Sequence, residues 1–354
     1  MPSDFLLYGS NGFMGEVIAR SAVQSGLKPI VAGRNAAKVQ ALAAELGLGH
    51  RVFSLDDSAG MDRALGDVVV VLHCAGPYVR TAKPMVDGCL RTGTQYLDIS
   101  GDMAEYQTLA ARNAGAKARG VMLLPGVGFD VVAADCLALH LKQRLPSAIR
   151  LTLGFHILGP APLPPGTITT VIEQVSSSGG IGVISNGRLE KLPFRGKTRM
   201  IDFGQGPVKA MALPWAGDVF MAFHSTGIPN IEEYPIFPSQ VRGQMMKIFL
   251  MRPLLRLAAA RRFLESRRGT GPTPDERAQT RTHVWGEVAD DQGRTAVSRL
   301  HGPEAGVTWA SSAALAAVRK VLAGNAPPGF QTPAKAYGSD LVLECEGVTR
   351  EDVN

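Results

Sequence analysis

The chain has 354 residues, of which 45% are hydrophobic and 19% are charged. This composition excludes a disordered, collagen-like or disulfide-stapled protein and is typical of a globular chain of about two domains. The formal net charge of +6 raises the question of a nucleic-acid or anionic-membrane partner. The four cysteines and seven histidines are dispersed, so neither a metal site nor a redox motif is predicted.

The N-terminal residues run into an apolar strand without the basic start of a signal peptide, and no stretch reaches the roughly 20 apolar residues of a membrane span. Lone thiols fit a reducing compartment. We therefore expect a cytoplasmic protein.

The first 150 residues alternate between short apolar runs and longer segments with helical periodicity. The Val-rich run at 68–72 is nearly continuous, as is typical of a strand covered on both faces. This alternation predicts an α/β fold with a doubly wound parallel sheet. The expected strands are 5–8, 29–32, 68–72, 96–99 and 121–124, and the expected helices are 14–25, 36–46, 84–91 and 105–119.

The pattern changes near residue 150. A long strand is expected at 151–157, and a helix at 167–178 follows a proline-rich loop. Short strands with Gly and Pro turns then extend to about residue 234. An Ala-rich helix is expected at 311–322, ended by a Gly/Pro-rich stretch.

A glycine triplet stands between the first strand and the first helix. The order strand, GxxGxxG, helix is typical of a dinucleotide site, where glycines allow a tight turn and close approach of a pyrophosphate to helix N–H groups. The competing interpretation is a glycine-rich turn without a ligand. The cofactor-binding candidates in this loop are Gly9, Ser10, Asn11, Gly12, Phe13 and Gly15.

The end of the second strand indicates which dinucleotide binds. NAD enzymes usually carry an acidic residue there for the ribose hydroxyl. Here the sequence has Arg34 and Asn35 instead, and a guanidinium can pair with a 2′-phosphate as a planar fork. We therefore predict NADP(H) and count both residues as candidates. The competing interpretation is that Arg34 is a solvated turn residue.

A third cofactor-binding candidate follows the Val-rich strand, because ligands of open α/β sheets lie beyond the carboxyl ends of the strands. Its residues are Cys74, Ala75, Gly76 and Pro77. Cys74 has no basic neighbour in the sequence, which favours a small packed residue over a nucleophile.

These motifs, with residues 93–98 and 124–130, resemble the saccharopine dehydrogenase-like NADP-binding family. Residues 328–334, 271–273 and 285–287 are similar to its trans-acting enoyl reductase branch. The resemblance implies a Rossmann domain at 1–130, a substrate or dimerisation α/β domain inserted at 131–310, and a segment at 311–354 that returns to the first domain. The chain departs from the family pattern at Gly101-Asp102, where the family usually has Gly-Glu.

The resemblance implies an NADPH-dependent oxidoreductase that transfers hydride to an activated C=C bond. Reduction of a C=N bond and NADPH binding without turnover remain as alternatives. The catalytic candidates follow strand ends, where an acid or hydroxyl can supply a proton or hydrogen bond. Capping of turns and helices is the competing role for the acids. The candidates are Tyr78, Asp98, Asp102 and Asp130.

The apolar segment 214–223 favours a hydrophobic small-molecule substrate, since an amino-acid substrate calls for convergent arginines. Segment 242–268 carries eight Lys and Arg residues and one Glu among large apolar residues. Such a segment can pack on its own domain, join a homodimer, or make a peripheral membrane or lipid-carrier contact. The segment has only two aromatic residues, Phe249 and Phe263, which do not alternate with the basic ones, so nucleic acid is not expected as a partner.

Overall fold

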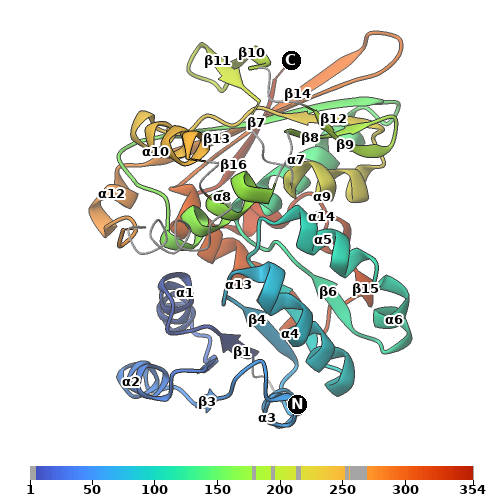
Figure 1. Ribbon diagram of the computed structural model, residues 1–354. Coiled ribbons are helices and arrows are strands. Elements are labelled where there is room, and N and C mark those ends of the chain that lie inside the picture. Colours follow the sequence, from blue (N-terminus) through green and yellow to red (C-terminus); the bar gives the residue numbers. More distant parts are fainter. Residues whose placement is uncertain are drawn as a thin grey trace. The chain divides into compact units, whose positions relative to one another are not determined.

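The computed structural model describes residues 5–177, 181–192, 196–212, 217–251, 255 and 269–353. The chain forms two compact units, Met1–Phe129 with Ala310–Tyr337 and Asp130–Trp309 with Gly338–Asn354 (Figure 1). The segment expected at 311–354 is therefore divided between the units, since only its first part joins the N-terminal residues.

The first unit is built on a seven-stranded sheet in the order β15-β6-β5-β4-β1-β2-β3, in which every pair of neighbours is parallel. The order reverses between β1 and β4, so a crevice for ligands is expected beyond their carboxyl ends. This sheet confirms the predicted doubly wound fold. Its strands are β1 Phe5–Tyr8, β2 Ile30–Gly33, β3 His50–Val52, β4 Val70–His73, β5 Gln95–Asp98, β6 Met122–Leu124 and β15 Gly329–Phe330.

Helices cover both faces of this sheet. One face packs against α1, α2 and α13 in a core that includes Leu7, Ile18, Leu72 and Val318, all completely buried. Because side chains alternate along a strand, the intervening residues face α3, α4 and α5. The helices of this unit are α1 Phe13–Gln24, α2 Ala36–Leu46, α3 Ser58–Leu65, α4 Tyr78–Thr92, α5 Met103–Ala110, α6 Asn113–Ala118, α13 Ala310–Leu322 and α14 Pro333–Tyr337.

The elements of this unit differ from the expected ones in three ways. Strand β3 and helix α3 were not expected, because β3 is a three-residue edge strand without an apolar run. Helix α4 begins at Tyr78 rather than Pro84, since Pro77 occupies its N-cap and Pro84 lies inside. The helix expected at 105–119 is two helices, and the break lets Asn113 Oδ1 accept the N–H of Phe330 on β15.

The second unit contains a mixed sheet in the order β16-β14-β13-β7-β12-β8-β9 and a separate β10-β11 hairpin. Strands β7 and β13 pair along nine residues each, which makes them the centre of the sheet. The strands are β7 Arg150–Leu158, β8 Ile181–Ser185, β9 Arg188–Leu192, β10 Thr198–Asp202, β11 Pro207–Met211, β12 Asn230–Glu233, β13 Arg281–Ala289, β14 Thr295–Gly302 and β16 Thr349–Val353.

Helices and short turns complete the second unit. Gly286 on β13 faces α7, where an added Cβ would meet Leu141 Cδ1 at 2.6 Å, so the helix packs directly on the strand backbone. Its elements are α7 Phe129–Arg144, α8 Pro165–Ser177, α9 Gly217–Thr226, α10 Ser239–Leu250, α12 Pro274–Ala278, a π-helical turn Ala305–Trp309 and a 3₁₀ turn Leu341–Glu344.

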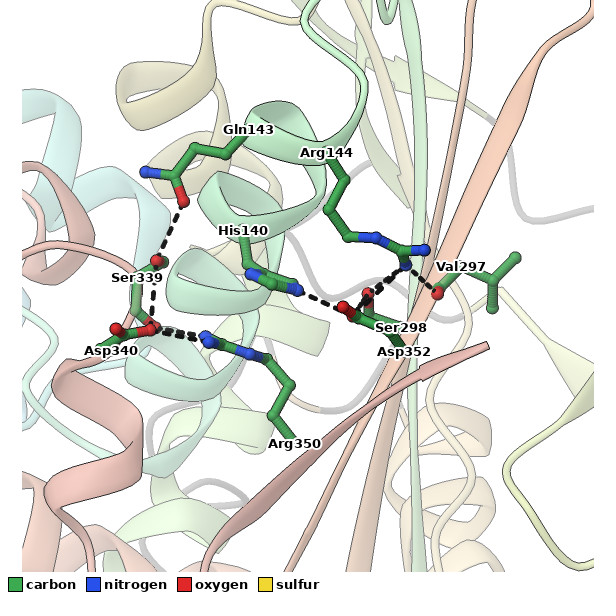
Figure 2. A network of polar contacts seen from close by, with 9 residues as sticks. All are labelled: His140, Gln143, Arg144, Val297, Ser298, Ser339, Asp340, Arg350 and Asp352. Carbon is green, nitrogen blue, oxygen red and sulfur yellow. Dashed lines mark hydrogen bonds and ion pairs between the residues drawn. The ribbon is translucent and has the colours of Figure 1, made fainter. Parts of the chain in front are cut away.

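The last residues of the chain are held to this unit by a polar network (Figure 2). Asp352 on β16 accepts hydrogen bonds from His140 Nε2 at 2.8 Å and Ser298 Oγ at 2.7 Å, and it pairs with Arg144 at 3.3 Å. Arg350 forms an ion pair with Asp340 at 2.8 Å. Strand β16 is thus fastened to α7 and β14 by side chains as well as by its ladder.

Most of segment 242–268 lies outside the described residues. Within α10, Met245 and Ile248 pack with Ile168 and Leu255, so this helix covers α8 with its apolar side. In the part of the chain that the structure describes, no helix is long and apolar enough to cross a membrane. A contact of the basic segment with lipid, carrier or a second chain stays a prediction.

Candidate functional site

The glycine loop sits at the carboxyl end of β1 and opens α1. Gly9 has φ +83°, and its N–H donates to Ala32 O at 2.8 Å, which folds the loop onto β2. An added Cβ on Gly15 would lie 2.2 Å from Gly9 O, so only glycine allows this helix to approach the strand. Gly12 is the N-cap of α1 and makes no side-chain cap, which leaves the first helical N–H groups available for an anion.

The loop residues predicted from the sequence lie together. An added Cβ on Gly9 would meet Ala75 at 2.8 Å, so the loop packs against the segment that follows β4. An added Cβ on Gly33 would meet Asn11 Oδ1 at 2.6 Å. The ends of β1, β2 and β4 therefore form one glycine-lined edge that fits a dinucleotide, because side chains are missing where its backbone contacts are needed.

The end of β2 carries the residues expected to select the cofactor. Asn35 caps α2, with Oδ1 accepting the N–H of Lys38 at 3.1 Å, as the sequence indicated. The Arg34 side chain is exposed, and among the described residues no carboxylate forms an ion pair with it. Its guanidinium is therefore free to meet a phosphate.

The end of β4 places Tyr78 beside the sheet. The Gly76–Pro77 peptide is cis, and Pro77 is the N-cap of α4. The Tyr78 hydroxyl donates to His73 O at 3.3 Å. Burial raises the pKa of Tyr78 well above its ordinary value, so the phenol stays protonated and can donate a hydrogen bond. Burial also raises the pKa of Cys74, which argues against a thiolate nucleophile there.

Asp102 caps a helix, which is the competing role that the sequence left open. Its Oδ1 accepts the N–H of Ala104 at 2.8 Å and so caps α5. The neighbouring Asp98, at the end of β5, accepts N–H bonds from Ser100 at 2.8 Å and Gly126 at 2.9 Å. Both acids thus hold backbone at the ligand edge of the sheet, and a catalytic role for Asp102 stays a prediction.

Sequence reasoning missed two buried polar residues of this edge. His73 is completely buried on β4, and burial lowers its pKa to about 3, so the ring is neutral. Glu105 on α5 is 3% exposed, and burial next to Asp98 raises its pKa well above the ordinary value. A Glu three residues after a helix-capping Asp predicts a cap, so no local signal marked Glu105 as buried.

Asp130 belongs to the second unit, where it opens α7. Its carboxyl neighbours are Asp218 on α9 and Glu233 on β12, which are 0% and 4% exposed. Burial raises the pKa of Asp130 to about 6 and that of Glu233 to about 7. Sequence reasoning singled out Asp130 alone, because the other two acids are brought to it only by the fold.

Two arginines of the second unit have polar partners within that unit. Arg199 forms an ion pair with Glu287 at 2.5 Å and lies 5.2 Å from the centre of the Trp285 ring. Arg150 donates to Asp290 O at 3.1 Å. Residues 214–216 of the expected apolar wall, and Arg195, lie outside the described residues.

The described part of that apolar segment is packed inside its own unit. Val219, Met221 and Ala222 are completely buried on α9, which contacts β8 and β12. These residues are therefore core residues in the structure and do not supply evidence of an apolar binding wall.

Comparison with known proteins shows which proteins the first unit is similar to. Residues 5–124 match the family model described as the saccharopine dehydrogenase NADP binding domain. A trans-acting enoyl reductase of Mycobacterium leprae is 29% identical over 150 residues, 40% of this chain and 36% of that protein. A saccharopine dehydrogenase-like oxidoreductase of Homo sapiens is 23% identical over 266 residues, 66% of this chain and 62% of that protein. The match thus spans less than two thirds of either relative's length.

A solved structure extends the likeness in fold to both units. The apo saccharopine dehydrogenase (L-Glu forming) from Saccharomyces cerevisiae superimposes with a TM-score of 0.65 at 14% identity, covering 99% of this chain and 100% of that one. Together with the glycine-lined edge and the unpaired Arg34, these likenesses identify the cofactor as NADP(H). Residues 5–124 are thus similar to a saccharopine dehydrogenase NADP-binding domain, and the chain as a whole is similar to proteins named saccharopine dehydrogenase-like oxidoreductase.

Proposed function

We propose that the chain is an NADPH-dependent oxidoreductase that reduces an activated C=C bond of a hydrophobic substrate. The observation that carries this proposal is the glycine-lined edge of the first unit, with the uncapped N-terminus of α1 and the unpaired Arg34 beside it. Bound NADPH supplies the hydride for the β-carbon of such a substrate. The relative named trans-acting enoyl reductase supports a C=C bond as the acceptor.

The residues of this edge then have distinct tasks. The N–H groups that follow Gly12 bind the pyrophosphate, and Arg34 binds the 2′-phosphate as a planar fork. Tyr78 donates a hydrogen bond to the substrate oxygen, on which negative charge develops as hydride adds to the conjugated carbon. This task suits a phenol whose raised pKa keeps it protonated at neutral pH.

The charges of the second unit support a substrate without an amino-acid carboxylate. Recognition of such a carboxylate calls for a free guanidinium, whereas Arg199 is paired with Glu287 and Arg150 is bonded to Asp290 O. An uncharged enoyl ester or ketone does not need a free guanidinium for its recognition.

A second candidate function is reduction of a C=N bond, favoured by one observation. Asp130 has a pKa raised to about 6 by burial, and an acid that titrates near neutral pH suits proton transfer to an imine nitrogen. The relatives named saccharopine dehydrogenase-like oxidoreductase are compatible with this chemistry.

A substrate panel separates these functions. NADPH oxidation, followed by absorbance with the full chain, is measured against medium- and long-chain enoyl esters, enones and cyclic imines. We expect turnover of the enoyl compounds, rising with chain length, and at least a tenfold lower kcat/KM in Tyr78→Phe. Faster oxidation with imines would favour the second candidate. Tight NADPH binding without oxidation anywhere in the panel would contradict both.

A further inference from the structure

A row of polar side chains lies buried beneath the ligand edge of the first unit. Tyr8, His73 and Asp98 occupy one rung across β1, β4 and β5, and the side chains of a rung point to the same face. Tyr96 lies two residues before Asp98 and so shares that face. All four are at most 3% exposed, which is unusual for polar groups at a sheet edge.

Two helices add further polar groups to this row. Tyr78 is the first residue of α4, its ring stands edge-on to His73 with centroids 5.5 Å apart, and its hydroxyl is close to the backbone of Ile99. Glu105 comes from the first turn of α5, which packs against α4. The candidate proton donor therefore shares a dry polar cluster with the carboxyls of Asp98 and Glu105.

Glu105 reaches this cluster because the helix cap is completed without it. In a capping box, the Glu three residues after the N-cap accepts the backbone N–H of the N-cap residue. Here the N–H of Asp102 donates to Ser100 Oγ at 3.0 Å. The Glu105 carboxyl instead lies against Asp98 and Ser100.

Among the described residues, the Asp98–Glu105 pair has no lysine or arginine partner that could balance two negative charges. Asp98 Oδ1 accepts two backbone N–H bonds, whereas its Oδ2 and both Glu105 oxygens have no hydrogen-bond partner of ordinary geometry. Among the described residues, no lysine or arginine forms an ion pair with either acid. The other titratable groups near the pair are His73, Cys74, Tyr78, Tyr96 and Asp102.

Apart from Asp102, which caps α5, the neighbours of the pair are uncharged. His73 is neutral, because burial lowers its pKa to about 3, and burial raises the pKa values of Tyr78, Tyr96 and Cys74. Two adjacent buried carboxyls do not both ionise near neutral pH. The N–H bonds favour the charge on Asp98, so the proton resides on Glu105.

We propose that Glu105 is a positioning residue whose neutral carboxyl keeps the Asp98–Glu105 pair at a single negative charge beneath Tyr78. The inference rests on the proposed function, in which Tyr78 donates to the substrate oxygen. A second charge on the pair would oppose the negative charge that develops on that oxygen and would push α5 away from β5. Reduction therefore slows as pH rises and the pair loses its shared proton.

Infrared spectroscopy tests the shared proton without any substrate. The folded chain at pH 7 is expected to show the C=O stretching band of a protonated carboxylic acid that is absent from Glu105→Gln. The same band is expected to shift in frequency in Asp98→Asn, because an amide replaces the carboxyl group that lies next to Glu105. The Asp218→Asn variant removes a different band, since that acid lies in the second unit. A Glu105→Gln spectrum with every carboxylic acid band retained would overturn the proposal.

The pH dependence of reduction tests the link to Tyr78. The kcat/KM of the wild-type chain is expected to fall at high pH. In Glu105→Gln the midpoint of this fall is expected to lie at least about one pH unit higher, and the plateau value of kcat/KM at lower pH should stay within about threefold of the wild type. Glu190→Gln, an exposed change on β9, is the control and keeps the wild-type profile.

The two proposals fail in different ways. An unchanged decline in Glu105→Gln, with enoyl turnover intact, would overturn the role of Glu105 and leave the proposed function standing. Absence of enoyl turnover would contradict the proposed function, and the infrared band would still decide whether Glu105 holds the shared proton. Circular dichroism confirms that each variant is folded before either measurement.

Discussion

The carboxyl cluster of the second unit makes stability depend on pH. Burial raises the folded-state pKa of Asp130 to about 6 and of Glu233 to about 7. A raised folded-state pKa means that the stabilisation is fully present below the unfolded-state pKa, near 4, and is lost as pH rises through the folded-state values. The free energy of unfolding is therefore expected to fall as pH rises from about 4 to about 7.

Asp218→Asn tests this dependence in chemical denaturation at about pH 4 and at pH 8. The amide mimics the protonated acid, so the variant is expected to match the wild type near pH 4, where the acid is largely protonated in both the folded and the unfolded state. At pH 8 it is expected to be more stable by about 1–3 kcal/mol, because each pKa unit corresponds to about 1.4 kcal/mol. Asp291→Asn, on the exposed turn between β13 and β14, serves as the control. An equal loss of stability with pH in Asp218→Asn and wild type would contradict the cluster's role.

The residues that were predictable from the sequence are those whose role is local. Gly15 and Asn35 do what their spacing indicates, because a tight turn and a helix cap depend on a few consecutive residues. Glu105 and Asp218 were not predictable, since their burial depends on elements far away in the sequence. The sequence pattern around an acid does not distinguish a helix cap from a buried carboxyl group.

The long apolar elements were predictable and the short polar ones were not. The run at 68–72 and the Ala-rich helix at 311–322 appear as β4 and α13 with shifts of one or two residues. Strand β16 carries Arg350, Glu351 and Asp352 and has no apolar alternation, so only its partners define it as a strand. Side-chain bonds from α7 and β14 supply what its composition lacks (Figure 2).

Asp352→Asn tests how far these bonds hold β16. The change removes the charge that faces His140 and Arg144, and the partly exposed pair limits the loss to about 1 kcal/mol. Amide hydrogen exchange of residues 349–353 is expected to speed up by about fivefold. Because the pKa of Asp352 is lowered, the difference between variant and wild type should shrink as pH falls toward that value. Unchanged exchange would contradict the anchoring role.

At the scale of the whole molecule, the sequence predicted a parallel sheet at the start and a break near residue 150, whereas the path of the C-terminal residues needed the structure. Each unit combines segments far apart in the chain, with crossings after Phe129, Trp309 and Tyr337. The net charge of +6 is also unevenly distributed, because segment 242–268 has a net charge of +7 and the remaining residues sum to −1. The positive charge thus belongs to one segment, and the expectation that nucleic acid is not a partner stays a prediction.

The central claim is that the first unit selects NADP(H) through Arg34 at the end of β2. Calorimetric titration of the full chain with NADPH and NADH, in the wild type and in Arg34→Asp, measures it directly. We expect the wild type to prefer NADPH, and Arg34→Asp to lose about 10- to 100-fold in NADPH affinity, since a hydrogen bond to a charged group is worth about 1.5–3 kcal/mol. Affinity for NADH should change little. An NADPH to NADH ratio that is the same in both proteins would contradict the account.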